Sequence, residues 1–141
     1  MRYVCGFAIC GPDVALVLKN RPDFLRGQHN GLGGKVEYKL GDTSAIVCMV
    51  REFKEEAGVD TTVDEWEIIG NLFIERDIVH FFKCEMDRER FDAIETQEDE
   101  EIVKVDVEDA LEPSFRLEKY ANLFLRAAFD KRMEMMNITL K

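Results

Sequence analysis

The N-terminal eighteen residues contain two short apolar runs on either side of a polar turn. The runs are residues 3–10 and 14–18, and Gly11, Pro12 and Asp13 lie between them. Apolar runs of this length, bounded by glycine and proline, are typical of buried strands. We therefore predict a β-hairpin at the start of the chain.

Further along the chain, residues 66–75 and 78–86 form two more apolar runs, and Arg76 and Asp77 separate them. This pattern predicts a second hairpin with a tight turn. Residues 102–107 alternate between apolar and charged side chains, which predicts one more strand.

Three aromatic residues in the second hairpin are candidates for either the core or a ligand pocket. Trp66 opens its strand, where a large aromatic is more often a core anchor than a platform for a nucleobase. Phe81 and Phe82 are neighbours, so their side chains point to opposite faces of the sheet. We expect one of the two to be buried and the other to be free to line a pocket.

Two segments have helical spacing. The first begins near Ser44, and Gly58 stands where a left-handed residue would end the helix. The second, residues 116–136, carries apolar side chains at helical spacing and predicts a long packing helix. The order of strands around the first helix, with a closing helix, predicts an α/β fold. We expect an α/β/α sandwich with a mixed sheet in one domain, residues 1–141.

Composition and charge narrow the function. The hydrophobic content of 46% and the charged content of 34% are those of a soluble globular protein. A net charge of −10 argues against a nucleic-acid polymer as partner, because a polyanion would be repelled. A small anionic substrate is compatible with this charge if a metal ion neutralises it locally.

The cysteines and the lack of long apolar segments bear on the cellular compartment. Cys5, Cys10, Cys48 and Cys84 are scattered and form no CxxC pair, so we interpret them as reduced thiols. No apolar run reaches the roughly 20 residues that cross a bilayer, and the N-terminus lacks a signal-peptide pattern. We expect a cytoplasmic protein, monomeric or homodimeric, that does not bind membranes.

The predicted first helix carries the chain's most distinctive acidic group. Glu52, Glu55 and Glu56 are spaced i, i+3 and i+4, which places their carboxylates on one face. Like charges this close repel one another unless a cation lies between them, and oxygen ligands suit Mg²⁺ or Mn²⁺. Arg51 lies one turn from Glu55 and would brace its carboxylate.

Upstream of this helix lie a basic loop and a glycine-rich segment. Lys19, Arg21 and Arg26 form a local cationic cluster in an acidic protein, which is either a solvated loop or a phosphate contact. The glycines of residues 31–34 let the backbone approach a ligand closely. Lys35, next to them, is a second candidate for phosphate contact.

These motifs together resemble the signature of the Nudix (MutT-like) hydrolases. That signature is a glycine, five residues, Glu, seven residues, then Arg-Glu-apolar-x-Glu-Glu-x-Gly-apolar. Residues 51–59, REFKEEAGV, match its second half at every fixed position. From Gly34 to Arg51 the chain is three residues longer than the pattern, and Asp42 replaces the glutamate before the helix. Either Glu37 or Asp42 fills the first acidic role.

The resemblance covers nearly the whole chain and implies the Nudix fold and a metal-dependent hydrolase. By the match, Glu52, Glu55, Glu56 and the Gly33 carbonyl would be metal ligands for Mg²⁺, with Mn²⁺ as an alternative. Many Nudix enzymes use a further carboxylate from a loop before a late strand. Residues 87–101 are the most polar part of this chain and read mostly as a solvated loop. Glu98 and Glu101 are the two candidates there, and the sequence does not rank them.

The resemblance also implies a nucleotide substrate. Residues 19–37 are similar to those of small MutT-type enzymes, which favours a (deoxy)nucleoside triphosphate, including oxidised forms, cleaved to the monophosphate and pyrophosphate. The residues assigned to catalysis are Arg51, Glu55, Glu56, Glu98 and Glu101, and those assigned to substrate binding are Arg21, Arg26, Asn30 and Lys35. The alternatives are hydrolysis of ADP-ribose, nucleotide sugars or dinucleoside polyphosphates, or a non-catalytic module that senses nucleotides.

Overall fold

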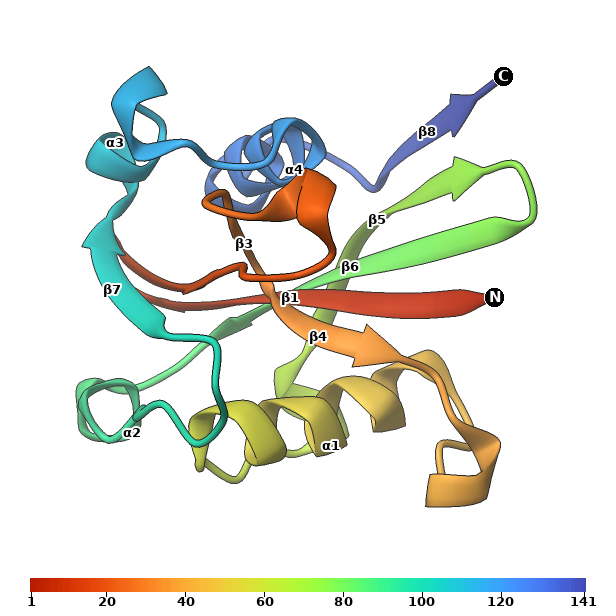
Figure 1. Cartoon of the computed structure of the whole chain (residues 1–141). Helices are drawn as coiled ribbons and strands as arrows, with labels where there is room; N and C mark the ends of the chain where they lie inside the picture. The colour runs from red at the N-terminus through yellow and green to blue at the C-terminus, as the bar shows by residue number, and fades with distance from the viewer.

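The computed structural model describes the whole chain, residues 1–141, as a mixed β-sheet covered by helices on both faces (Figure 1). Short 3₁₀ helices occupy several loops. In chain order the strands and α-helices are β1 (Arg2–Cys10), β2 (Asp13–Leu18), β3 (His29–Asn30), β4 (Leu32–Lys35), α1 (Ala45–Ala57), β5 (Glu67–Ile74), β6 (Asp77–Glu85), α2 (Arg88–Asp92), β7 (Ile102–Asp106), α3 (Val107–Ala110), α4 (Lys119–Phe129) and β8 (Met136–Leu140). The predicted α/β/α sandwich is confirmed. None of the helices has the length and apolar character that crossing a membrane requires.

The sheet divides at its central strand. Along the main path the order is β3-β2-β1-β6-β5-β8, while β4 pairs with β1 and β7 pairs with β2. The first half of β1 pairs with β4, and its last residues, from Ala8 to Cys10, pair with β2. β1 runs parallel to β6 and antiparallel to β2 and β4, which makes the sheet mixed. β1 therefore has two antiparallel partners along its length, β4 beside its first half and β2 beside its end.

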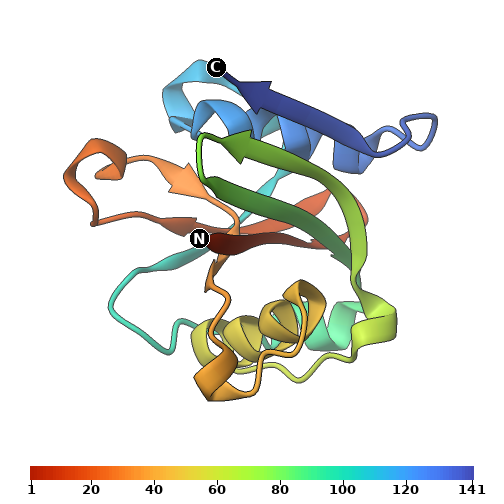
Figure 2. The same cartoon turned by 90° about the vertical axis from the view of Figure 1, so that its right-hand side faces the viewer.

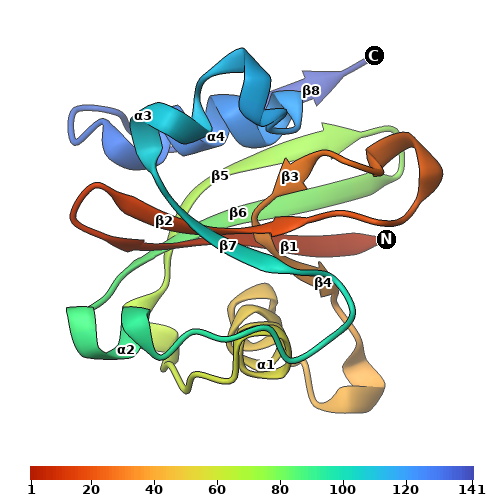
Figure 3. The ribbon, with the colours of Figure 1, turned by 60° about the vertical axis from the view of Figure 1, so that its left-hand side comes forward.

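Each face of the sheet has its own apolar core. Figures 2 and 3 show α1 and α2 on one face and α3 and α4 on the other. Met49, Phe53 and Trp66 fill the layer under α1, and Phe7 and Phe124 belong to the layer under α4. The two hairpins predicted from the apolar runs are present as β1–β2 and β5–β6, although the second turn falls at Glu75 and Arg76.

The local sequence explains where α1 begins and ends. The Ser44 hydroxyl accepts a hydrogen bond from the Val47 N–H at 3.4 Å, as an N-cap does. Gly58 adopts a left-handed φ of 75° and its N–H donates to the Lys54 carbonyl, which ends the helix. Both predicted ends are confirmed. Phe53 is fully buried, so the helix has an apolar side as well as the acidic one.

The prediction of one long helix over residues 116–136 was wrong. The helix α4 ends at Phe129, and after a turn at residues 131–132 the chain forms β8, which pairs in parallel with β5. Met135, expected inside the helix, is 52% exposed. The good helix formers of residues 131–134 continue the helical pattern in the sequence. Pairing with β5 instead lets Ile138 and Leu140 pack against the α4-side core.

Two further expectations are met only in part. Phe81 and Phe82 belong to the cores on opposite faces of the sheet, and each is only 3% exposed. Phe81 nevertheless also lines a cavity on the α4 side, as was expected of one of the two. Trp66 is buried in the core, as predicted. The polar run 87–101 is not a solvated loop throughout, because it contains α2, whose Phe91 is buried in the core under α1.

A substitution of Phe124 tests how strongly the packing of α4 on the sheet stabilises the fold. The Phe124 ring stacks on Phe81 with centroids 3.9 Å apart and an angle of 3° between the planes, and it is fully buried. We expect Phe124→Ala to lower the free energy of unfolding by about 3–5 kcal/mol, because the change leaves a cavity. Urea unfolding checks this. The matched control is Leu123→Ala, whose side chain is 46% exposed and should matter far less; equal losses for the two variants would contradict the packing.

Candidate active site

A polar cavity of about 380 Å³ lies against the acidic face of α1. It combines residues from α1 with residues from β4 and three loops, and nearly all of its side chains are polar. Its lining consists of Lys19, Arg21, Gly33, Lys35, Glu37, Leu40, Arg51, Glu52, Glu55, Glu56, Glu98, Asp99 and Glu100. We call this cavity the acid pocket. It gathers most of the residues to which the sequence assigned catalysis or metal binding.

Glu52 and Glu56 form the centre of the acid pocket. Their side chains lie within hydrogen-bonding reach of each other, and Glu52 is 15% exposed. Burial, together with the charge of Glu52, raises the pKa of Glu56 to about 8, and burial also raises the pKa of Glu52. The Gly33 N–H donates to Glu56 Oε1 at 3.1 Å. Two neighbouring carboxylates are thus held where ionising both is costly.

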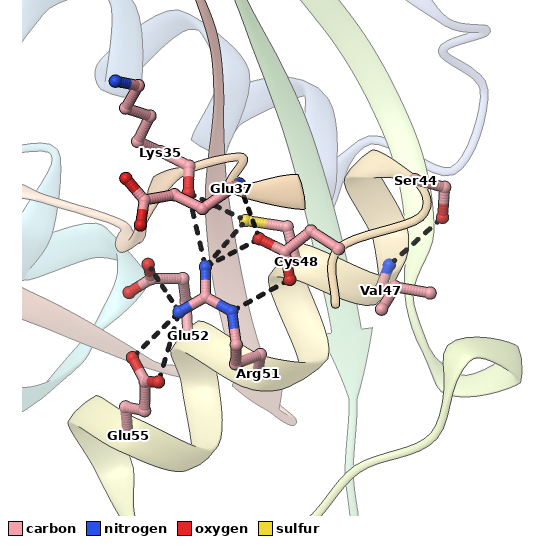
Figure 4. A network of polar contacts seen from close by, with 9 residues as sticks. Lys35, Glu37, Ser44, Val47, Cys48, Arg51, Glu52 and Glu55 are labelled. Carbon is pink, nitrogen blue, oxygen red and sulfur yellow. Dashed lines mark hydrogen bonds and ion pairs between the residues drawn. The ribbon is translucent and has the colours of Figure 1, made fainter. Parts of the chain in front are cut away.

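Arg51 organises the other side of the acidic face (Figure 4). Its guanidinium donates to the Asp42 carboxylate at 2.7 and 2.9 Å and to both oxygens of Glu55 at 3.0 and 3.2 Å. It also lies 3.3 Å from Glu52. Asp42 is 1% exposed, and the hydrogen bond from Arg51 lowers its pKa to about 2. Of the two candidates for the first acidic role, Asp42 is therefore the residue that pairs with Arg51, while the Glu37 N–H donates to it.

The three glutamates of α1 do not play equal parts in this arrangement. Glu55 is 46% exposed and its carboxylate is engaged by Arg51, whereas Glu52 and Glu56 face each other. A methyl group on Gly34 would come within 2.5 Å of Glu52 Oε1, and one on Gly33 within 1.9 Å of the Val4 carbonyl oxygen. The glycines of β4 thus let the backbone lie directly against β1 and against the acids of α1.

The loop before β7 brings one of the two proposed additional carboxylates to the acid pocket. The Gln97 N–H donates to the Glu56 carbonyl and the Glu95 N–H to the Ala57 carbonyl, so this loop is attached to the end of α1. Glu98 lines the acid pocket, and its charge contributes to the raised pKa values of Glu52 and Glu56. Glu101 is not among the lining residues, and its backbone carbonyl pairs with the Leu18 N–H instead.

A second and larger cavity, of about 950 Å³, lies on the α4 side of the sheet. Apolar side chains from the β2–β3 loop, the sheet and the start of α4 contribute about half of its lining. These include Phe24, Leu25, Leu72, Val79, Phe81, Leu117 and Tyr120. We call it the apolar cavity. It shares Lys19 and Gly33 with the acid pocket, so the two cavities meet at these residues.

The residues assigned to substrate binding are divided between these cavities. Arg21 and Lys35 line the acid pocket, and Asn30 lines the apolar cavity. Arg26 lines neither; it is exposed and pairs with Asp23 at 3.1 Å. The basic cluster of the sequence is therefore split by the fold.

The donor set of the acid pocket suits a hard divalent cation. As the side chains stand, no three carboxylate, thiol or imidazole groups are close enough together to enclose a metal ion. Burial nevertheless raises the pKa of both Glu52 and Glu56, so a positive charge placed near the two carboxyls would favour their ionised forms. Glu98 lines the same pocket. Oxygen ligands of this kind fit Mg²⁺ or Mn²⁺.

Comparisons with known proteins agree with this geometry. A family model described as the NUDIX domain matches residues 1–127. A search of curated proteins finds no match. Among solved structures, the NUDIX domain of Shewanella oneidensis NrtR, complexed with ADP ribose, matches with a TM-score of 0.75 at 16% identity, covering 91% of this chain and 85% of that one.

Two MutT structures are also similar. One comes from work on MutT of Aliivibrio salmonicida and Vibrio cholerae, with a TM-score of 0.70 at 21% identity over 89% of this chain and 95% of that one. The other is MutT of Bacillus halodurans, with a TM-score of 0.66 at 18% identity over 94% and 84% of the two chains. At these identities the likeness concerns the fold.

The family match covers most of the chain, so the protein belongs to the Nudix family. By this family it is a Nudix hydrolase. The resemblance found in the sequence is thereby confirmed.

Several residues of the site carried no clear signal in the sequence. Glu100 was part of a run expected to be solvated, yet its side chain is only 13% exposed. Leu117, just before α4, and Tyr120, in its first turn, read as packing residues. They do pack against the core on this face, and they also line the apolar cavity. Only the docking of α4 across the sheet reveals this, because a residue that packs and one that lines a pocket have the same periodicity.

The Asp42–Arg51 pair predicts a pH-dependent stability. Because the pKa of Asp42 is about 2 in the folded protein and 3.8 in a free carboxyl, the ion pair stabilises the fold above about pH 4. This stabilisation is lost as the pH falls from about 4 to about 2. We expect Asp42→Asn to reduce the free energy of unfolding by about 2 kcal/mol at pH 7, and the difference from wild type to shrink toward pH 2.

Urea unfolding at a series of pH values measures this difference. Asp60→Asn is the control, because the Asp60 side chain is 86% exposed and should contribute little at any pH. A wild-type minus Asp42→Asn difference that stays constant down to pH 2.5 would contradict the role given to the pair.

Proposed function

We propose that this Nudix hydrolase is a Mg²⁺-dependent pyrophosphohydrolase. Its substrate would be a (deoxy)nucleoside triphosphate, including oxidised forms, which it cleaves to the nucleoside monophosphate and pyrophosphate. The observation that supports this proposal is the meeting of the acid pocket and the apolar cavity at Lys19 and Gly33. A nucleoside fits a part-apolar cavity of about 950 Å³, and its phosphates would then extend toward the acids of α1.

The carboxylates of α1 and the nearby loop supply the hydrolytic machinery in this proposal. Glu52 and Glu56, with Glu98, would hold the divalent cation. The Gly33 carbonyl and Glu55 remain the further ligands that the family pattern suggests. The cation would neutralise the negative charge of the phosphates. Arg51 keeps Glu55 and Glu52 oriented, because its guanidinium contacts both.

The attack on phosphorus needs a proton acceptor for the incoming water. In our proposal a pocket carboxylate takes this proton, with Glu98 and Glu56 as the candidates because both line the acid pocket. Lys35 and Arg21, on the same pocket, would contact phosphate oxygens. The water attacks a phosphorus atom of the anhydride, its oxygen stays on that phosphorus, and the other phosphate leaves.

A second substrate class has one observation in its favour. The structurally similar NUDIX domain of Shewanella oneidensis NrtR was solved with ADP ribose. The apolar cavity is large, and its polar lining residues Gln28, Asn30 and Asp77 offer hydrogen bonds to a sugar. Hydrolysis of ADP-ribose or a nucleotide sugar is therefore the alternative, and binding of such a nucleotide without turnover is another.

A phosphate-release screen tests the proposed function. The purified protein is incubated with Mg²⁺ or Mn²⁺ and inorganic pyrophosphatase. The substrates are canonical and oxidised dNTPs, NTPs, ADP-ribose, nucleotide sugars and dinucleoside polyphosphates, with a phosphatase added where only monophosphates form. We expect metal-dependent release from nucleoside triphosphates. Glu56→Gln should lower the rate about a thousandfold or more, because a principal ligand and charge are lost.

Glu89→Gln is the matched control, because Glu89 is an exposed residue of α2 that lines neither cavity. Turnover by Glu56→Gln equal to that of wild type would overturn the assignment of the site. Release from ADP-ribose or nucleotide sugars alone would move the proposal to the alternative substrate class. Nucleotide binding without release from any substrate would favour the sensing module.

A separate prediction concerns Glu98 and Glu101, the two candidate carboxylates in the loop before β7. We expect Glu98→Gln to lower kcat about a hundredfold or more, as loss of a general base or a ligand does, and Glu101→Gln to have a much smaller effect. The reason is that Glu98 lines the acid pocket while Glu101 does not. Steady-state kinetics of the two variants on the same substrate decide this, and a larger loss in Glu101→Gln would reverse the ranking.

A further inference from the structure

We infer that Glu100 is a positioning residue that holds the Lys19 ammonium at the junction of the acid pocket and the apolar cavity. There Lys19 binds the phosphate that joins the nucleoside to the reacting anhydride. The inference rests on the proposed function, because it concerns how a nucleotide lies across the two cavities.

The position of Lys19 is the first observation. Lys19 and Gly33 line both cavities, and of these two residues only Lys19 carries a charge. A ligand whose nucleoside lies in the apolar cavity and whose anhydride lies among Glu52 and Glu56 must pass this junction. The phosphate attached to the nucleoside is the part of such a ligand that lies there, and an ammonium group suits it.

The contacts of Glu100 are the second observation. One carboxylate oxygen accepts from Lys19 Nζ at 2.8 Å, and the other accepts from the Asn20 N–H at 2.8 Å. The side chains of Lys19 and Glu100 are 23% and 13% exposed, so this is a largely buried ion pair. Glu100 thereby fastens the end of β2 to the loop that carries Glu98. The nearby pair of Arg21 and Asp99 is exposed by comparison, at 69% and 59%.

Charge explains why Lys19 needs such a partner. Lys19 is close enough to Glu56 to lower its pKa. An unrestrained ammonium on a flexible stem would pair with the acids of α1 and occupy the place of a cation. Glu100 engages one N–H of the ammonium, and the other two remain for phosphate oxygens.

Binding measurements without metal separate this role from catalysis. The probes are adenosine, guanosine, cytidine and uridine together with their 5′-monophosphates, and the readout is isothermal titration calorimetry. We expect wild type to bind a monophosphate more tightly than its nucleoside. Lys19→Met should weaken monophosphate binding roughly ten- to hundredfold and leave nucleoside binding within about twofold. Lys19→Arg should restore much of the loss, because it keeps the charge.

The role of Glu100 is tested by a double-mutant cycle. Glu100→Gln keeps the size of the side chain but has one carbonyl oxygen where the carboxylate has two. It should weaken monophosphate binding by a smaller factor than Lys19→Met does, and it should cause no further loss in a Lys19→Met background. Lys54→Met and Asp60→Asn are the matched controls, because these residues form an exposed ion pair that lines neither cavity.

Three results would overturn the inference. They are equal loss of nucleoside and monophosphate binding in Lys19→Met, unchanged monophosphate binding in that variant, and losses from Lys19→Met and Glu100→Gln that add in full. Hydrolysis of nucleotides by wild type together with one of these results removes only this inference. A wild-type protein that neither binds nor hydrolyses any nucleotide removes the proposed function as well.

Discussion

The crowding of negative charge at the end of α1 is the constraint on which the rest of this structure depends. Glu52 and Glu56 are held side by side with raised pKa values, and Glu98 approaches them from a loop that is hydrogen-bonded to the helix end. Neighbouring donor groups offset part of the repulsion between these carboxylates. Arg51 pairs with Asp42 and Glu55, and Gly33 of β4 donates its backbone N–H to Glu56. What remains is an anionic pocket that suits a divalent cation and, with it, a phosphate anhydride.

The division of the sheet determines what lies next to that pocket. Because β1 pairs with β4 along one half and with β2 at its end, the segments around Lys19 and Gly33 reach both faces of the fold. The acids lie on the α1 side and the apolar cavity on the α4 side. A Nudix hydrolase built in this way can hold two chemically different parts of one ligand in two adjoining spaces. In the function proposed above, substrate choice depends on the apolar cavity, while the hydrolysis takes place in the acid pocket.

Short-range sequence signals were sufficient to predict α1 and the two hairpins, because capping and turn residues mark the ends of these elements. Ser44 and Gly58 delimit α1, and the apolar runs gave both hairpins. The same reasoning failed after Phe129. Residues 131–134 are good helix formers, and the strand β8 exists because Ile138 and Leu140 gain burial against α4 by pairing with β5. Helix propensity is worth tenths of a kilocalorie per residue, whereas full burial of an aliphatic side chain is worth about 1.5–3 kcal/mol, so even the partial burial of Ile138 and Leu140 outweighs it.

The sequence by itself determined the family, the helix that carries the acids and the oxygen-rich character of the candidate metal site, because these depend on residue type and short-range spacing. Only the tertiary structure decided that Asp42 pairs with Arg51, that Glu98 rather than Glu101 lines the acid pocket, and that Glu100 is buried against Lys19. Each of these contacts joins segments brought together by strand pairing or by loop docking. Residues 98, 100 and 101 look alike in the sequence because a run of acids carries no periodic signal, and their environments differ only once the loop is fixed between α1 and β2.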